Sequence, residues 1–220
     1  MNKRHEIKFI IPWEYHKTIY HKIKTNHGHF KLFYEPRFIN NIYFDTPDLR
    51  NYYENIDGNS KRKKIRIRWY GNFFGEIVTP VIEIKEKKGM IVNKTSIPIQ
   101  SFFIKRNMSI RNVSKSLENN FAYIRLLHAT IINRYKREYL LSNDKKFRLT
   151  IDTNQCFTNP RNIGIPQKLF KTGPEPMIIE LKYSIQWEQE ARYITNLLGL
   201  RINKNSKYVN SIHAQNKYIL

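Results

Sequence analysis

The chain has 220 residues, of which 40% are hydrophobic and 14% aromatic, and its formal net charge is +21. This composition predicts one folded domain with a sizeable core and excludes a disordered chain. The single Cys156 excludes an internal disulfide framework and fits a reducing compartment. No run approaches the ~18 apolar residues of a membrane-spanning helix, and the charged N-terminus does not match a signal peptide.

The excess of positive charge predicts an anionic partner, such as a nucleic acid, a polyphosphorylated ligand or an acidic membrane surface. An alternative explanation is a low-GC genome, which enriches Lys, Asn and Ile throughout a chain. That explanation does not account for where the arginines lie.

The first half of the chain predicts strands and two helices. Residues 3–11 alternate as a strand, and a helix follows and ends before Gly28. A second strand ends near Phe44, where Asp45 or Thr46 caps a short helix. Strands are then expected over residues 62–70, 79–88 and 91–99.

The second half predicts an α+β architecture dominated by antiparallel strands. Residues 1–220 show no credible domain boundary, so a single domain is expected. The predicted elements are two short helices over 101–129, a hairpin of 130–141 with 145–153, an irregular connection over 155–176, a strand over 177–184, a helix over 186–199, and a loop or short helical piece over 201–214.

A charge pattern recurs in the predicted strands. Three of them contain Glu-apolar-Lys, at 6–8, 83–85 and 180–182, and a fourth contains Arg66 and Arg68 in the stretch "IRIR". Because side chains two residues apart share one face of a strand, each of these strands has a strongly charged face.

Two architectures satisfy this pattern. In an open antiparallel sheet the apolar face packs on helices and the charged face meets water, which the spacing alone favours. In a closed barrel the charged residues would line the interior and would have to pair with one another or with a bound ion. Arg148 and Asp152 add a fifth strand with a charged face and leave both alternatives open.

The residue types suit polyphosphate chemistry. The planar fork of arginine binds phosphate oxygens bidentately, and lysine adds a compact charge. Carboxylates on the same face would hold Mg²⁺ or Mn²⁺ through oxygen ligands. Phosphoryl transfer needs little covalent help from a protein, so positioning and electrostatics can supply the mechanism.

Seven motifs spread over about residues 3–213 resemble, in order, those of the VTC domain. This is the catalytic domain of polyphosphate polymerases of the vacuolar transporter chaperone type, within the triphosphate tunnel metalloenzymes and related to CYTH domains. The resemblance is to the compact, stand-alone bacterial form and implies a closed eight-stranded antiparallel β-barrel, a tunnel with a charged interior and flanking helices. The motifs are "RHEIKF", "IYFDTPDLRNYYENIDG", "KKIRIRWYG", "VIEIKEKKG", "YKREY…FRLTIDT", "IIELKYS" and "KNSKY".

The resemblance also implies functional residues. In "INRYKREYL" either Arg134, Lys136 and Glu138 or Tyr135, Arg137 and Tyr139 could face inward. The Tyr-x-Arg pattern of the family favours Tyr135 and Arg137 inside, which leaves Arg134 and Lys136 in solvent. The implied catalytic residues are Lys8, Arg66, Arg68, Lys85, Arg137, Arg148, Lys182 and Lys207; the substrate-binding residues are Lys94, Tyr135, Lys204 and Ser206; and the metal ligands are Glu180, Glu6 and Glu83, although Glu6 and Glu83 could instead pair with neighbouring cations.

The expected function is a polyphosphate polymerase that transfers the γ-phosphoryl group of ATP to a growing polyphosphate chain with Mn²⁺ or Mg²⁺. One alternative is a triphosphatase or nucleotide phosphohydrolase with the same fold, in which water is the acceptor. Less favoured alternatives are a non-catalytic polyphosphate-binding subunit and a nucleic-acid-binding sheet that uses Arg66, Arg68, Trp69 and Tyr70.

The partners follow from the expected function. ATP and inorganic polyphosphate are expected as ligands, together with a membrane-protein partner for export of the polymer. No nucleic acid is expected, since Glu6, Glu83 and Glu180 share faces with the cations and would repel its backbone. The expected location is cytoplasmic, at most peripheral to the inner face of the membrane.

Overall fold

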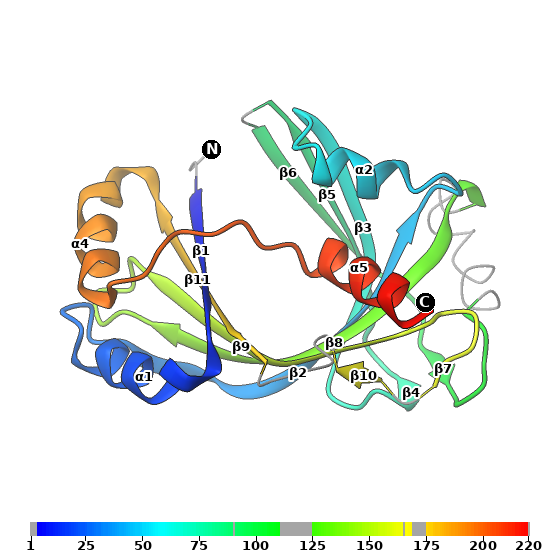
Figure 1. Ribbon diagram of the computed structural model, residues 1–220, viewed down its shortest axis with the longest axis horizontal. Coiled ribbons are helices and arrows are strands. Elements are labelled where there is room, and N and C mark those ends of the chain that lie inside the picture. Colours follow the sequence, from blue (N-terminus) through cyan, green and yellow to red (C-terminus); the bar gives the residue numbers. More distant parts are fainter. Residues whose placement is uncertain (1–3, 90, 111–124, 165, 169–174, 220) are drawn as a thin grey trace. The chain divides into compact units, whose positions relative to one another are not determined.

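The computed structural model describes residues 4–89, 91–110, 125–164, 166–168 and 175–219 (Figure 1). Hydrogen bonding orders the main strands β1-β11-β9-β8-β2-β3-β5-β6. In addition, β10 (Gln167–Lys168) pairs with β9, and β4 (Gly75–Ile77) forms a separate two-stranded sheet with β7 (Phe102–Ile104). The strand pairings with a defined register are all antiparallel.

The residues group into two compact units. Unit 1 comprises residues 1–37, 136–155 and 170–205, and unit 2 comprises residues 38–135, 156–169 and 206–220. Three strands contribute residues to both units: β2 (Lys31–Asp45), β8 (His128–Leu141) and β9 (Arg148–Thr158). The expectation of a single domain over residues 1–220 stays a prediction.

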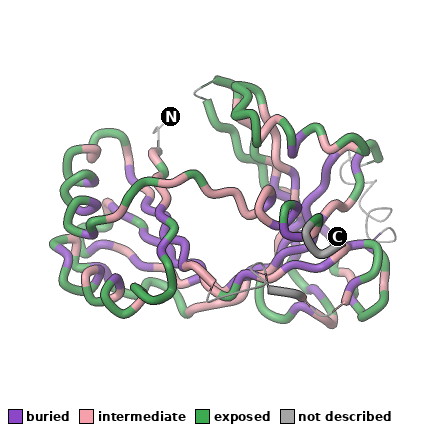
Figure 2. The backbone as a smooth tube through the Cα atoms, viewed as in Figure 1, coloured by how far each residue is buried: buried purple, intermediate pink, exposed green. Residues whose placement is uncertain are grey.

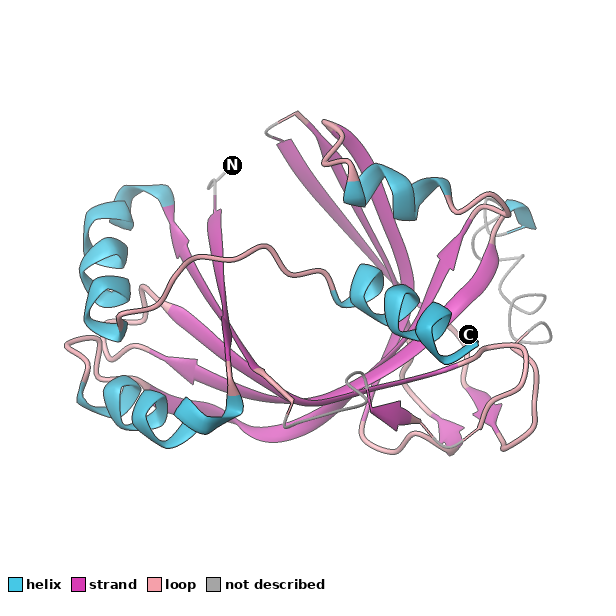
Figure 3. Cartoon of the chain, in the orientation of Figure 1, coloured by secondary structure: helices cyan, strands magenta, loops and turns pink. Residues whose placement is uncertain are grey.

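Unit 1 is built on an antiparallel set of strands covered on one face by helices (Figure 3). The apolar residues of its strands alternate with charged ones and form a core with Ile19, Ile23 and Ile194 of the helices. Its further elements are β1 (Arg4–Ile11), a 3₁₀ turn (Trp13–Tyr15), α1 (His16–Thr25), β11 (Met177–Ser184), a 3₁₀ turn (Ile185–Trp187) and α4 (Glu188–Leu198).

Unit 2 contains the cationic strand β3. Ile65, Ile67 and Trp69 of this strand are almost fully buried in the core of unit 2, as the period-two pattern predicts, while the arginines between them point to the other face. Its further elements are α2 (Arg50–Ile56), β3 (Lys61–Tyr70), β5 (Val81–Lys88), β6 (Ile91–Pro98) and α5 (Lys207–Ile219).

The predicted closed barrel is wrong, because the strand order ends at β1 on one side and at β6 on the other. Among the described residues, no strand pairing joins these two ends. The outer edge of β1 is instead occupied by an irregular segment: the amide of Asn203 donates to the carbonyl of Lys8 (2.8 Å), and its side-chain oxygen accepts from the amide of Ile10 (3.4 Å). The sheet is open, as the spacing of the charges favoured.

Two smaller expectations also change. The tail forms the regular helix α5, longer than the loop or short helical piece expected there. Of the two short helices expected over 101–129, residues 102–104 form β7, and residues 111–124 lie outside the described part of the chain. Among the described residues, no helix combines the length and the apolar character needed to cross a membrane.

Candidate anion-binding site

Three cations of unit 2 converge on one carboxylate. The register of β3 with β5 places Arg66 directly opposite Glu83. Arg66 Nε donates to Glu83 Oε2 at 2.8 Å, Lys94 Nζ of β6 lies 2.6 Å from Oε1, and Arg68 Nη1 lies 3.4 Å from Oε2. We call these four residues the Glu83 cluster.

The Glu83 cluster is buried and carries an excess of positive charge. The side chain of Glu83 is 9% exposed and that of Arg68 is 12% exposed. Burial of Glu83 on its own raises its pKa, but Arg66 and Arg68, with the hydrogen bonds from Lys94 and Arg66, outweigh it and lower the pKa to about 2. Three cations against one ionised carboxylate leave positive charge available for an anion.

Strand β2 orients the two arginines. Arg66 Nη1 donates to the hydroxyl of Tyr43 (3.2 Å), and Arg68 Nε donates to Asn41 Oδ1 (3.2 Å). Neither β2 residue was predicted as part of a site. The signal was present, because Asn41, Tyr43 and Asp45 alternate with Ile42 and Phe44 along one strand.

Lys85 lies in a row of lysines next to the Glu83 cluster. The register places Lys64, Lys85 and Lys94 side by side on β3, β5 and β6. Lys64 Nζ donates to the hydroxyl of Ser206 at 3.0 Å. The predicted residue Lys85 is therefore a direct cross-strand neighbour of the predicted residue Lys94.

The first turn of α5 carries Ser206 and Lys207. The hydroxyl of Ser206 accepts from the amide of Val209 (3.4 Å) as an N-cap of α5, and Lys207 Nζ lies 4.6 Å from the ring centroid of Tyr135. Tyr135 is 1% exposed. Three residues predicted to bind substrate or catalyse thus meet in unit 2.

Tyr208 anchors this turn, although sequence reasoning gave it no function. Its hydroxyl donates to Asp45, and its ring stacks on Tyr43 with centroids 5.0 Å apart. Asp45 also accepts from the amides of Asn51 and Tyr52 at 2.8 Å each, so it caps α2 as expected. Burial, followed by the charge of Asp45, raises the pKa of Tyr208, which keeps the hydroxyl protonated as a donor.

Unit 1 contains a second charged cluster, which we call the Glu180 cluster. Arg137 forms a bidentate ion pair with Asp152 (2.6 and 2.7 Å) and lies 3.7 Å from Glu180. Lys182 Nζ lies 2.7 Å from Glu180 and 3.8 Å from Glu6, while Lys8 Nζ lies 3.0 Å from Glu6. The members are Glu6, Lys8, Arg137, Asp152, Glu180 and Lys182.

Lys8 stays protonated in the Glu180 cluster. Burial on its own lowers its pKa, but Glu180 and Glu6 outweigh it and raise the pKa above the ordinary value of 10.5. Lys8 Nζ also donates to the carbonyl of Asn205 (3.2 Å), next to the exposed Lys204. Arg148 is exposed too and lies opposite Lys182 in the register of β9 with β11.

Alternate residues of β8 lie on opposite faces of the strand, so Tyr135 and Arg137 share one face and Arg134 lies on the other. Tyr135 lies against Lys207, and Arg137 belongs to the Glu180 cluster. Arg134, on the other face, is not fully solvated, because its guanidinium lies 3.9 Å from the ring centroid of Phe38 and burial lowers its pKa.

The carboxylates of the Glu180 cluster fit a divalent cation only as a two-donor site. Among the described residues, no group of three or more His, Cys, Asp or Glu side chains could hold a metal ion. Glu6 and Glu180, however, already share one cation, the ammonium of Lys182. Mg²⁺ is commonly held by one or two carboxylates together with waters and phosphate oxygens, so this pair is the candidate metal position.

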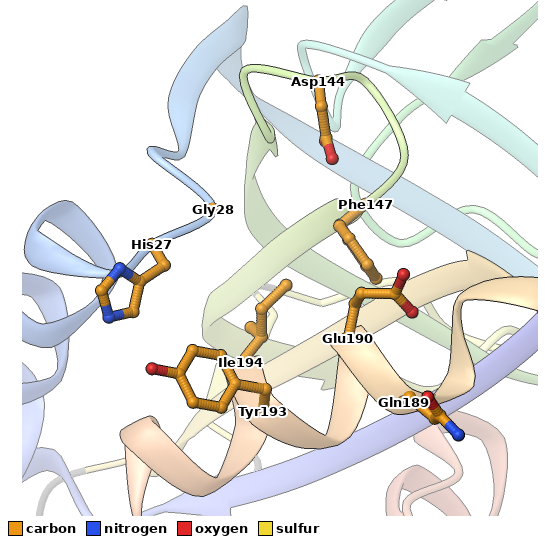
Figure 4. Close-up of a pocket in the computed structure, with 8 residues that line it drawn as sticks. All are labelled: His27, Gly28, Asp144, Phe147, Gln189, Glu190, Tyr193 and Ile194. Atoms are coloured by element: carbon orange, nitrogen blue, oxygen red, sulfur yellow. The ribbon is translucent and has the colours of Figure 1, made fainter.

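The pocket in Figure 4 is chemically different from both clusters. It has a volume of about 460 Å³ and lies in unit 1 between α4, the turn after α1 and the turn between β8 and β9. Asp144 and Glu190 line it, and no predicted site residue does. Carboxylates without a lining cation make it unsuitable for a polyanion.

The fold and the charged clusters define a class of protein, one with an open, mainly antiparallel sheet and a charged cluster on the strands of each unit. A search of solved structures finds this fold in two candidate adenylate cyclases. The protein from Vibrio parahaemolyticus has 13% sequence identity and a TM-score of 0.51, with 93% of this chain and 95% of that chain covered. The protein from Bacillus halodurans has 14% identity and a TM-score of 0.54, with 91% and 92% covered.

The sequence comparison identifies the family. The VTC domain profile matches residues 3–216, nearly the whole chain, so the chain belongs to the VTC domain family. The resemblance seen in the sequence motifs is thereby confirmed. The search of curated proteins found no match.

Proposed function

We propose that this chain is a polyphosphate polymerase that elongates inorganic polyphosphate with the γ-phosphoryl group of ATP. The observation that supports it best is the Glu83 cluster, in which Arg66, Arg68 and Lys94 converge on one carboxylate in a chain of the VTC domain family. Such an excess of cations, two of them arginines that are mostly buried, suits phosphate oxygens better than any neutral ligand.

In the proposed reaction, a terminal oxygen of the polyphosphate chain attacks the γ-phosphorus of ATP. The bond between that phosphorus and the oxygen bridging to the β-phosphate breaks, and ADP leaves with the electron pair. A terminal phosphate is largely ionised at neutral pH, since its second pKa is about 6. The acceptor therefore needs no general base, and positioning with charge neutralisation can carry the catalysis.

The residues of unit 2 would bind and orient phosphate groups. Arg66 and Arg68 are held by Tyr43 and Asn41, so their forks are already fixed before the ligand binds. Lys94 is half-exposed and can leave Glu83 to follow a phosphate oxygen. Lys85, Lys207 and Ser206 would add further contacts.

Glu6 and Glu180 of unit 1 would hold a divalent cation. When bound, Mg²⁺ or Mn²⁺ neutralises charge on phosphate oxygens. Lys182 would then move away from the two carboxylates, and Arg137 would keep Glu180 oriented. Lys8, Arg148 and Lys204 complete the cationic residues proposed for this unit.

The experiment is incubation with ATP and Mn²⁺, followed by gel analysis for polyphosphate chains. We expect long chains from the wild type and a loss of at least about 100-fold in Arg66→Ala with Arg68→Ala, because each charge-assisted contact contributes roughly 1.5–3 kcal/mol. Lys17→Ala with Lys24→Ala, both exposed on α1, removes the same charge elsewhere and should leave the activity unchanged. Free phosphate without polymer would instead establish a triphosphatase.

Chelation of the metal tests the candidate metal position separately. EDTA should abolish polymer formation, and added Mn²⁺ should restore it. Glu180→Gln should raise the Mn²⁺ concentration needed for half-maximal activity, whereas the exposed Glu190→Gln should not. An unchanged Mn²⁺ dependence in Glu180→Gln would exclude this carboxylate as a ligand.

A further inference from the structure

We propose that one end of the β3-β5-β6 strands docks on an anionic lipid surface. This docking surface, the basic tip, lies within unit 2, at the strand ends beyond Lys64 and Lys85. It combines clustered cations with exposed aliphatic side chains at the strand ends. Its members are Lys61, Arg62, Lys63, Lys87 and Lys88, together with Ile56, Ile91 and Val92.

The register brings like charges together at the basic tip. Lys61 lies opposite Lys88, and Arg62 lies opposite Lys87. Like charges directly across two strands destabilise a sheet, so these pairs favour an anionic partner. Within the described residues of 56–63 and 86–92, these five cations stand against two acids, Asp57 and Glu86, which leaves a net charge of +3. Glu86 pairs with Lys63 at 2.8 Å.

The loops at the basic tip are tied to one another. The amide of Gly89 donates to the carbonyl of Ser60 (2.9 Å), which joins the β5–β6 turn to the loop before β3. Arg62 Nη1 donates to the carbonyls of Gly58 (3.2 Å) and Asn59 (2.9 Å). The cations are therefore presented by a fixed edge, so binding a surface costs little conformational entropy.

Exposed aliphatic side chains lie among these cations. Ile91 is 60% exposed and pairs in register with Lys88, while Val92 is 47% exposed and pairs with Lys87. Ile56, at the end of α2, is 46% exposed. Figure 2 shows this end of the strands as exposed (green).

The combination favours a bilayer over soluble polyphosphate. Polyphosphate would use the cations but gains nothing from exposed isoleucine and valine, whereas a lipid surface uses both through headgroup attraction and shallow apolar insertion. By strand parity, Lys61, Lys88 and Ile91 also lie on the face opposite to the Glu83 cluster. These three residues are therefore not an extension of that cluster, whereas Arg62, Lys87 and Val92 lie on the same face as the cluster.

The test is co-sedimentation with phosphatidylcholine vesicles, with and without phosphatidylserine. We expect the wild type to bind only the vesicles that contain phosphatidylserine, and to bind them less at high salt. Lys61→Gln with Lys88→Gln should lower this binding about 25-fold, since each cation near an anionic surface contributes about fivefold. Ile91→Ser with Val92→Ser should lower it about tenfold at constant salt.

A control variant distinguishes docking through the basic tip from attraction by the overall positive charge of the protein. Lys17→Gln with Lys24→Gln removes two exposed cations of α1 and should bind like the wild type, and melting curves should show that all variants fold. Equal losses in this control, or full binding by the Ile91→Ser, Val92→Ser variant, would overturn the proposal. Binding of polyphosphate or RNA without binding of vesicles would also overturn it. Vesicle binding does not require catalysis, so the proposal stands or falls independently of polymerase activity.

Discussion

The two charged clusters share arginine, lysine and glutamate but differ in charge balance. In the Glu180 cluster, three cations (Lys8, Arg137, Lys182) face three carboxylates (Glu6, Asp152, Glu180). In the Glu83 cluster, three cations face one carboxylate. In a balanced cluster the charges compensate one another, whereas a cluster with surplus cations keeps its binding capacity for an anion from solution.

The largest expected effect is on stability, from Arg137→Met in the Glu180 cluster. Asp152 is fully buried, and Arg137→Met removes two charge-assisted hydrogen bonds from this buried carboxylate, which costs about 3–5 kcal/mol. Urea denaturation measures the free energy of unfolding. Arg66→Met is the counterpart in the other cluster and should cost less, because Glu83 keeps Arg68 and Lys94.

A double variant checks the cause. Arg137→Met with Asp152→Leu removes both charges and should recover most of the lost stability, since the main cost is a buried carboxylate that has lost its guanidinium. If the double variant is as unstable as Arg137→Met alone, the loss comes from packing and the balanced-cluster interpretation is wrong.

The next largest effect is a loss of affinity for an anion, and we expect it from variants of the Glu83 cluster. Without metal, Arg66→Ala with Arg68→Ala should weaken binding of a non-hydrolysable ATP analogue about 100-fold, as measured by calorimetry. Lys182→Met should weaken it less than about fivefold, because the charge of its cluster is already compensated. If both variants lose the same affinity for the analogue, the two clusters contribute equally to metal-free binding. The difference in charge balance would then not decide where the anion binds.

The sequence predicted the charged face of each strand but not these partnerships. Period-two spacing sufficed to place Arg66 and Arg68 on one face and Ile65, Ile67 and Trp69 in the core. The pairing of Arg137 with Asp152 depends on how two strands are aligned, which spacing within one strand does not define. Whether the sheet closes depends on what occupies the edge of β1, and the Asn203 segment that does so carries no strand pattern.

A smaller effect is expected on the pH dependence of the unfolding free energy, through the ionisation of Glu83. The pKa of Glu83 is lowered from 4.5 to about 2 on folding, so its stabilisation is present above pH 4.5 and is lost as the pH falls toward 2. At neutral pH, Glu83→Gln should cost about 2 kcal/mol, since it replaces charge-assisted hydrogen bonds.

Urea midpoints at a series of pH values measure this dependence. The difference between the wild type and Glu83→Gln should shrink as the pH falls through 4.5, while the exposed Glu76→Gln should follow the wild type throughout. A difference that stays constant down to pH 2 would mean that Glu83 does not titrate in this range, contrary to its pKa of about 2.

The smallest effect concerns α5, which adds Ser206 and Lys207 to the residues of unit 2. Tyr208→Phe removes only the hydroxyl that donates to Asp45 and keeps the ring stacked on Tyr43. We expect a loss of about 1–1.5 kcal/mol in unfolding free energy and a KM for ATP raised about threefold with kcat nearly unchanged, since Lys207 loses part of its anchoring. Tyr193→Phe, at an exposed position of α4, is the matched control and should change neither quantity. A loss of stability without a change in KM would make Tyr208 a structural residue only, and the surplus cations of unit 2 would then be fixed by their strands alone.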